Sequence, residues 1–411
     1  MVAKKLTIFL FLHYIVFVAV LHASFDAYSI LKGRAIQGRA CEELLTVPPQ
    51  ELGVLREDFI HDSTRYAIEL PTTEIRNQCA MGNCWIYAAL ADLETRILIE
   101  TKKMVNLSEA YLTYLALVHK TLDALKNPGL QIGMGNFMTN ANWLIEQYGI
   151  VPDEVWQPRV FVSNKENSLK LFEFLDGRVA QYHLAFAKAQ TNKEKARLYR
   201  KASKDVLDIL QVYFGDVPES FQYNGRTYAS PKDFAESLPV IPRLSWTCLV
   251  PVREPLPENL RGGKQTNAST QFNRTLPNPL VEEVLTFDEI EQKIVENLKQ
   301  GKPVPISFES VDAFIDKKTG IMSIDAFFHP EGFETPQWRF KHHFGWNDGN
   351  HIVLIVGVDL DSTGQIIKFK IKNSWGEKTG DHGTFHMYRD YFRAYLNAAY
   401  IKDDSFSEEN P

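Results

Sequence analysis

The spacing of apolar residues changes from helical to strand-like along this 411-residue chain, and this change constrains the fold more than any other feature. From Cys84 to about Lys102, apolar residues recur every three or four positions while Asp92, Glu94 and Arg96 occupy the other side, which predicts a helix. Similar spacing predicts a helix from about 108 to 117, one ending at Gly149, two between 164 and 215, and one over 290–298. Runs of β-branched and aromatic residues then predict strands over 304–308, 351–358, 366–372 and 384–388. Helices followed by strands predict an α+β fold whose C-terminal half is a twisted sheet or barrel.

Changes in composition and periodicity divide the chain into segments. We expect a leader over 1–24, an N-terminal arm over 25–70, a helical lobe over 71–163, a helical insertion over 164–240, a loop and β lobe over 241–402, and an acidic tail over 403–411. The second of the two helices in the insertion carries a basic face, which lacks interleaved aromatic residues and is therefore typical of a solvated helix surface.

The first 24 residues resemble a secretory signal. Two lysines, Lys4 and Lys5, precede an apolar run over 6–21, and the small residues Ala23 and Ser24 follow it. This pattern predicts removal of the segment and a secreted or periplasmic protein. The alternative is that residues 6–21 stay in place as a membrane anchor, although the run is short for a full span.

Composition and cysteine usage give no support to several classes of function. A net charge of −6 gives no reason to expect a nucleic-acid partner. Four cysteines (Cys41, Cys79, Cys84 and Cys248) are too few for a disulfide scaffold, and the sequence does not say which pair would bond. Cys79 and Cys84 have no second Cys or His pair of matching spacing, so we expect neither a metal site nor a cofactor.

Four polar residues fit the requirements of nucleophilic catalysis. Cys84 lies at the first turn of its helix, where the amide dipoles favour a thiolate and lower the thiol pKa. His351 opens one apolar strand and Asn373 follows a later one, so Asn373 can orient the imidazole while Trp375 shields their hydrogen bond. Gln78, six residues before Cys84, can supply an oxyanion donor beside the Cys84 N–H. Cys79 is expected to be a packing neighbour.

The motifs Gln78-x5-Cys84-Trp85, Asn350-His351 and Lys372-Asn-Ser-Trp-Gly376 occur in the order found in papain-like cysteine peptidases, which the chain resembles. This resemblance implies Cys84 as nucleophile, His351 as general base and acid, Asn373 as the residue that orients it, and Gln78 as oxyanion donor. It also implies a cleft between a helical lobe and a β lobe, with peptides or proteins as substrates.

His351 lies 267 positions after Cys84 (351 − 84), about twice the separation in the simple papain pattern. The intervening segment from Leu198 to about Phe234 is similar to the insertion of the bleomycin hydrolase and aminopeptidase C branch. That resemblance implies hexameric rings, and so a homo-oligomer, with a C-terminal arm in each cleft whose carboxylate pairs with the substrate amine. The tail 403–411 is either such an arm or a solvated acidic tail. Where the family has a Gly-Gly strip for extended substrate, this chain has Gly135-Asn136.

Together these features predict a thiol peptidase that forms an acyl-enzyme on Cys84, with an aminopeptidase mode favoured over an endopeptidase mode. Two alternatives stay open. The same Cys-His-Asn set can deamidate or transamidate glutamine side chains, and the fold can persist as a binding protein with idle chemistry.

Overall fold

The computed structural model describes residues 53–160, 165–240, 246–252, 280–328 and 350–402. It divides into two compact units. In the smaller unit, Gly53 and Val54 exchange backbone hydrogen bonds of 3.0 Å with Phe328, and Leu55 forms a bridge with Phe327. All further elements belong to the larger unit, residues 58–326 and 335–411.

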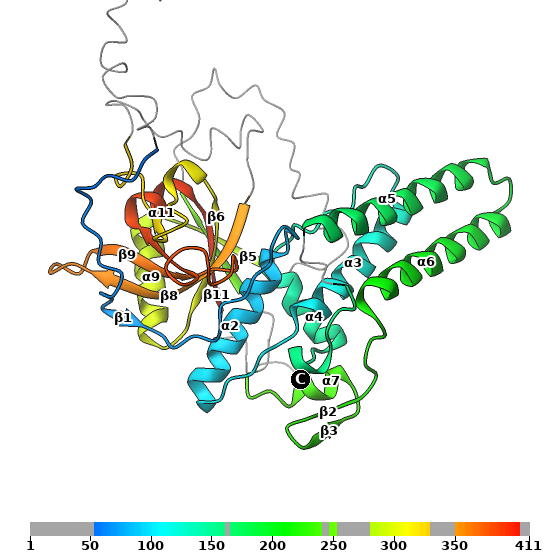
Figure 1. Ribbon diagram of the computed structural model, residues 1–411, viewed down its shortest axis with the longest axis horizontal. Helices are drawn as coiled ribbons and strands as arrows, with labels where there is room; N and C mark the ends of the chain where they lie inside the picture. The colour runs from blue at the N-terminus through cyan, green and yellow to red at the C-terminus, as the bar shows by residue number, and fades with distance from the viewer. Residues whose placement is uncertain (1–52, 161–164, 241–245, 253–279, 329–349, 403–411) are drawn as a thin grey trace, which may run out of the picture. The chain divides into compact units, whose positions relative to one another are not determined.

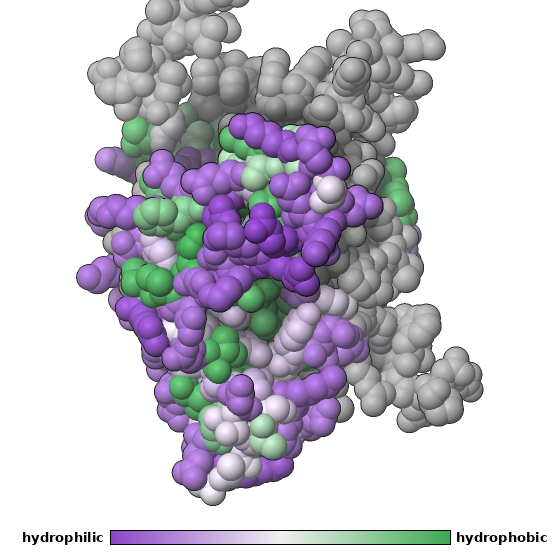
Figure 2. Space-filling model, turned by 90° about the vertical axis from the view of Figure 1, so that its right-hand side faces the viewer, coloured by the Kyte–Doolittle hydropathy of each residue, from purple (hydrophilic) through white to green (hydrophobic). Residues whose placement is uncertain are grey.

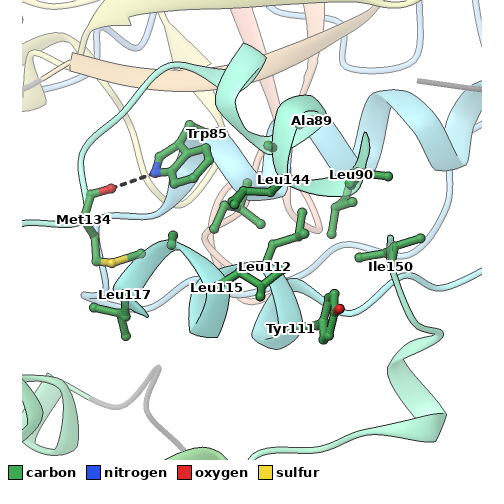
Figure 3. Packing of buried hydrophobic residues seen from close by; sticks show 14 of the residues in the cluster. Trp85, Ala89, Leu90, Tyr111, Leu112, Leu115, Leu117, Met134, Leu144 and Ile150 are labelled. Atoms are coloured by element: carbon green, nitrogen blue, oxygen red, sulfur yellow. Dashed lines mark hydrogen bonds between the residues drawn. The ribbon is translucent and has the colours of Figure 1, made fainter. Parts of the chain in front are cut away.

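The helical part of the larger unit is built on α2 (Cys84–Thr101), α3 (Glu109–Lys126) and α4 (Met138–Tyr148). These helices were predicted from sequence, and their ends have the expected capping. Ser108 accepts a hydrogen bond from the Tyr111 N–H at the start of α3, and Gly149 ends α4 with a φ of +78°. Figure 3 shows the apolar side chains of the three helices interdigitating around Leu112 and Leu144.

The predicted insertion is a pair of long antiparallel helices, α5 (Lys165–Lys188) and α6 (Asn192–Phe214), which extend beside α3 (Figure 1). Apolar residues on the inner side of α6, such as Val206 and Leu210, are fully buried. A small hairpin of β2 (Phe221–Tyr223) and β3 (Arg226–Tyr228) follows, and then α7 (Pro231–Glu236), which packs on α4.

Nine strands among the described residues form one sheet, in the order β5-β4-β11-β6-β8-β9-β10-β7 with β1 paired to β8. The strands are β1 (Ile68–Glu69), β4 (Trp246–Pro251), β5 (Leu280–Leu285), β6 (Val304–Glu309), β7 (Ile321–Met322), β8 (Asn350–Leu360), β9 (Ile366–Lys372), β10 (Thr384–Tyr388) and β11 (Leu396–Lys402). The helices α9 (Phe287–Lys299) and α11 (Arg389–Tyr395) pack against this sheet, and the short 3-10 turns are Asp153–Val155 and Asp312–Phe314. This arrangement confirms the predicted α+β class. β1 lies in the segment that the sequence suggested as an arm.

Helix α2 is the element that joins the two halves, because it packs on α3 and α4 on one side and on β8 and β6 on the other. The sequence suggested a polar outer face at Asp92, Glu94 and Arg96, and the structure corrects this. Asp92 and Glu94 are buried. Asp92 accepts from the Arg96 guanidinium at 2.9 Å, and Glu94 accepts from the Thr73 hydroxyl at 2.7 Å and the Leu107 N–H at 2.8 Å. Because this part of α2 lies between two lobes, Asp92 and Glu94 are buried and satisfied by hydrogen bonds inside the protein.

Candidate active site

The Cys84 thiol is buried at the start of α2, against the first residues of β8. Backbone N–H groups of Ile352 and Trp85 approach the sulfur and favour the thiolate. Burial outweighs them, however, and raises the pKa of the Cys84 thiol. The sequence predicted a lowered pKa from the helix N-terminus alone. That part is wrong, because it omitted the desolvation that the β lobe imposes.

His351 directly precedes Ile352, whose backbone N–H faces the Cys84 sulfur, so strand β8 passes beside the thiol at this point. Its Nε2 is 2.8 Å from the Asn373 side-chain oxygen, and its ring stacks on Trp375 with centroids 4.8 Å apart. Burial lowers the pKa of His351 to about 4, although the Asn373 bond acts in the opposite direction. These two pKa shifts favour the neutral thiol and the neutral imidazole.

Register explains why His351 and Asn373 meet. β8 and β9 pair antiparallel, with Leu354 opposite Lys372, so the first residues of β8 lie next to the last residues of β9. Trp375 is held behind the imidazole by an edge contact with Phe385, whose ring centroid is 5.2 Å away. Trp375 therefore covers one face of the His351 ring.

Gln78 is buried and fixed to the same motif. Its N–H donates to the Ser374 carbonyl at 2.9 Å, and its side-chain oxygen accepts from the Ser374 hydroxyl at 2.6 Å. The amide nitrogen of Gln78 therefore points away from Ser374, since the two ends of an amide face in different directions. The structure thus joins His351 to Asn373, and Gln78 to Ser374 in the same motif, while the Cys84 sulfur faces the backbone of Ile352 next to His351. Ser374 is a partner that the sequence did not identify.

Gly135 and Asn136 lie on the segment that approaches α2 from α4. The Trp85 indole N–H donates to the Met134 carbonyl at 2.7 Å (Figure 3). The side-chain oxygen of Asn136 accepts from the Phe137 N–H at 3.0 Å and from Asn140, so this side chain is turned toward α4.

Cys79 departs from the prediction. It is exposed, with a φ of +49°, and its N–H donates to the Asn77 side chain at 2.8 Å. It is therefore part of a polar turn before α2 and does not pack in the core. Cys79 and Cys84 are free thiols, whereas Cys41 lies outside the described residues.

Sequence reasoning also missed a buried set of charges behind Asn373. Arg76, Glu94, Glu109 and Lys372 surround a cavity of about 20 Å³, enough for about one water molecule. Burial raises the pKa of Glu109 to about 8 and lowers the pKa of Lys372 to about 8. Lys372 directly precedes Asn373, and Arg76 lies two residues before Gln78. This proximity in sequence could have indicated that the two charged residues lie near the site. Within the described residues, no group of three His, Cys, Asp or Glu side chains could hold a metal ion.

Comparison with known proteins gives the family. The Peptidase C1-like family profile matches residues 54–243 and 279–410. The chain belongs to this family. It is a cysteine-type peptidase, and peptides are its substrates.

Several relatives are similar to this peptidase over most of both chains. Aminopeptidase G of Lactobacillus delbrueckii is 24% identical, covering 80% of this chain and 81% of its own. Aminopeptidase C of Listeria monocytogenes is 23% identical, with 78% of each chain covered. The mitochondrial cysteine proteinase 1 of Saccharomyces cerevisiae is 23% identical, with 80% and 74% covered. The crystal structure of PepW from Lactobacillus rhamnosis shares the fold, with a TM-score of 0.66, 20% identity and coverage of 83% and 82%.

The comparisons contradict the secreted or periplasmic location predicted from residues 1–24, and the alternative anchor at 6–21. The matched relatives carry the names of aminopeptidases and of a mitochondrial proteinase. Two lysines before an apolar run are a compositional pattern, and here His13 interrupts that run. Residues 1–52 lie outside the described part of the chain. Within that part, no helix is long and apolar enough to cross a membrane.

Proposed function

We propose that this peptidase is a thiol aminopeptidase that removes residues from the free N-terminus of peptides through an acyl-enzyme on Cys84. The observation that carries the catalytic part is the buried 2.8 Å bond between His351 and Asn373, next to the backbone that faces the Cys84 sulfur. The aminopeptidase part is supported by the relatives that carry that name.

The proposed reaction begins with neutral groups. As the Cys84 sulfur attacks the substrate carbonyl carbon, its proton passes to His351, which Asn373 holds by the other ring nitrogen. The oxyanion that forms accepts hydrogen bonds from the Cys84 N–H and the Gln78 amide. His351 then gives the proton to the leaving amine, the C–N bond breaks, and an acyl-thioester remains. Water, deprotonated by His351, hydrolyses that thioester and regenerates the thiol.

The burial of both groups decides the timing of the first step. Burial raises the thiol pKa and lowers the pKa of His351 to about 4, so a separated ion pair is unfavourable before substrate binds. Proton transfer is therefore expected together with the attack on the carbonyl carbon. In this proposal Trp375, stacked on the imidazole, and the strip at Gly135 and Asn136 contact the bound peptide on either side of the scissile bond.

Two peptides of one sequence, with free and acetylated N-termini, test the mode of cleavage. We expect stepwise release of N-terminal residues from the free peptide and no cleavage of the acetylated peptide. Internal cleavage of both peptides would refute the aminopeptidase mode and leave an endopeptidase. A chain ending at Lys402 tests the tail 403–411, which lies outside the described residues. If the tail blocks the cleft, this shortened chain cleaves the acetylated peptide.

We also propose that the protein forms a homo-oligomer. Five large apolar side chains on the α5–α6 pair are between 41% and 66% exposed, namely Leu169, Phe174, Leu184, Leu207 and Val212. Figure 2, which views the molecule from the side toward which this pair extends, shows hydrophobic patches next to strongly hydrophilic ones. Sedimentation velocity is expected to give a mass above 47.0 kDa. Replacing Phe174 by Ser should lower that mass, and a wild-type monomer would refute the proposal.

A further inference from the structure

The segment before α4 is held from two sides by buried donors. The Lys120 ammonium on α3 donates to the carbonyls of Gly133, at 2.7 Å, and Gly135, at 2.8 Å. The indole N–H of Trp85 on α2 donates to the carbonyl between them, that of Met134, at 2.7 Å. Three consecutive carbonyls are thus bound by side chains from the helical lobe. In Figure 3 the Trp85–Met134 bond crosses from α2 to this segment.

These bonds fix the segment relative to the nucleophile. Trp85 is fully buried and directly follows Cys84, so the Met134 bond ties the segment to the first turn of α2. Lys120 is 7% exposed and reaches the segment from the opposite helix. A Cβ built on Gly135 would have no atom within 4 Å, so the outer side of the chain is open at this residue. The segment therefore has its carbonyls anchored inside and an open side at Gly135.

Burying an ammonium is costly unless it replaces the lost hydration with strong bonds. Burial lowers the pKa of Lys120 to about 7, which is a sign of that cost. Helix α3 would be more stable with an apolar residue at this position if only packing mattered. The two carbonyl bonds are the compensation that the structure shows, and both lie on one short segment.

We propose that Lys120 is a positioning residue for peptide binding. It fixes the position of the backbone of residues 133–136 relative to Cys84, so that the backbone of an extended substrate can pair with these residues. This proposal rests on the proposed function for the role of Gly135 and Asn136. Lys120 acts through the segment and touches neither the thiol nor the imidazole.

The variant Lys120→Met tests this role, since it keeps the side-chain length and removes the donors. We expect a KM for N-terminally free peptides that is at least about tenfold higher, with kcat within about twofold of wild type. The rate at which a small epoxide labels Cys84 is expected to be unchanged, because the reagent needs no extended pairing. Lys120→Arg, which restores donors, should recover part of the KM.

The control is Leu125→Ala, which removes a buried side chain from the same helix and leaves the Lys120 and Trp85 donors unchanged. It should lower the melting temperature and leave KM near the wild-type value. The proposal is overturned if Lys120→Met has the wild-type KM, or if kcat and the labelling rate fall along with the rise in KM, as in a general loss of structure.

Peptide affinity separates this proposal from the proposed function. In a Cys84→Ala background, fluorescence titration measures the Kd of an N-terminally free peptide without turnover. A weaker Kd with Lys120→Met supports the positioning role even if the wild-type enzyme proves to cleave peptides internally. An unchanged Kd refutes it even if the aminopeptidase mode is established.

Discussion

Replacing Asn373 by Ala removes the acceptor that holds His351. The bond is 2.8 Å long and buried, so its loss leaves the Nε2–H of the imidazole without a partner, at a cost of about 1–3 kcal/mol. The Ser374 N–H, which donates to the same oxygen at 2.7 Å, loses its partner as well. If the lost hydrogen bond raises the free energy of the transition state by this amount, kcat/KM falls by about 5- to 150-fold, since 1.36 kcal/mol corresponds to a tenfold change in rate.

The assay is the initial rate of hydrolysis of an N-terminally free peptide over a range of pH. Asn373→Asp is the matched control, because it keeps the acceptor oxygen and the shape of the side chain. The Asn373 amide nitrogen has no partner within the described residues, so this replacement loses no hydrogen bond. Its added negative charge favours the imidazolium, and the acidic limb of the pH profile should move to higher pH. An Asn373→Ala enzyme within twofold of wild type would refute the orienting role.

Three further predictions follow from the packing around the site. Burial raises the pKa of Glu109 to about 8, so the folded state keeps a proton that the unfolded chain loses above its ordinary pKa of 4.5. The free energy of unfolding in urea should therefore fall as the pH rises from about 5 to 8. Glu109→Gln should flatten that pH dependence. If the variant shows the same pH dependence as the wild type, Glu109 is not its source. Trp375→Ala removes a ring stacked on His351, worth about 0.5–1.5 kcal/mol, and should lower kcat/KM about 2- to 10-fold, less than Asn373→Ala. Gly149→Ala would place a Cβ 2.2 Å from the Pro231 carbonyl carbon at a φ of +78°, so thermal unfolding should show a loss of at least about 1–3 kcal/mol with KM unchanged.

Local patterns in the sequence predict the elements that position the site. The periodicity after Cys84 gives the start of α2 correctly, and Ser108 and Gly149 mark helix ends by their own backbone chemistry. The strands that carry His351 and precede Asn373 were also predicted, because their β-branched runs are long and apolar. The expectation that their ends are neighbours agrees with the register.

What the sequence did not predict depends on contacts between distant residues. Asp92 and Glu94 have the spacing of an exposed helix face, and only the packing of α2 between two lobes buries them. Lys120 is one lysine among many until α3 turns it toward residues 133–135. The pKa of Cys84 depends on how deeply the β lobe buries the thiol, which the helix N-terminus alone does not reveal.

Whether Cys84 is the nucleophile is tested by measuring peptide turnover and covalent labelling in the wild-type protein and in Cys84→Ala. Exposed Cys79 is the competing thiol, so Cys79→Ser serves as the control. We predict that an epoxide forms one adduct with the protein, located on the fragment that contains Cys84, and that it stops peptide hydrolysis. Cys79→Ser should behave as the wild type in both measurements. Cys84→Ala should have no peptidase activity. Full peptidase activity in Cys84→Ala would show that Cys84 is not the nucleophile.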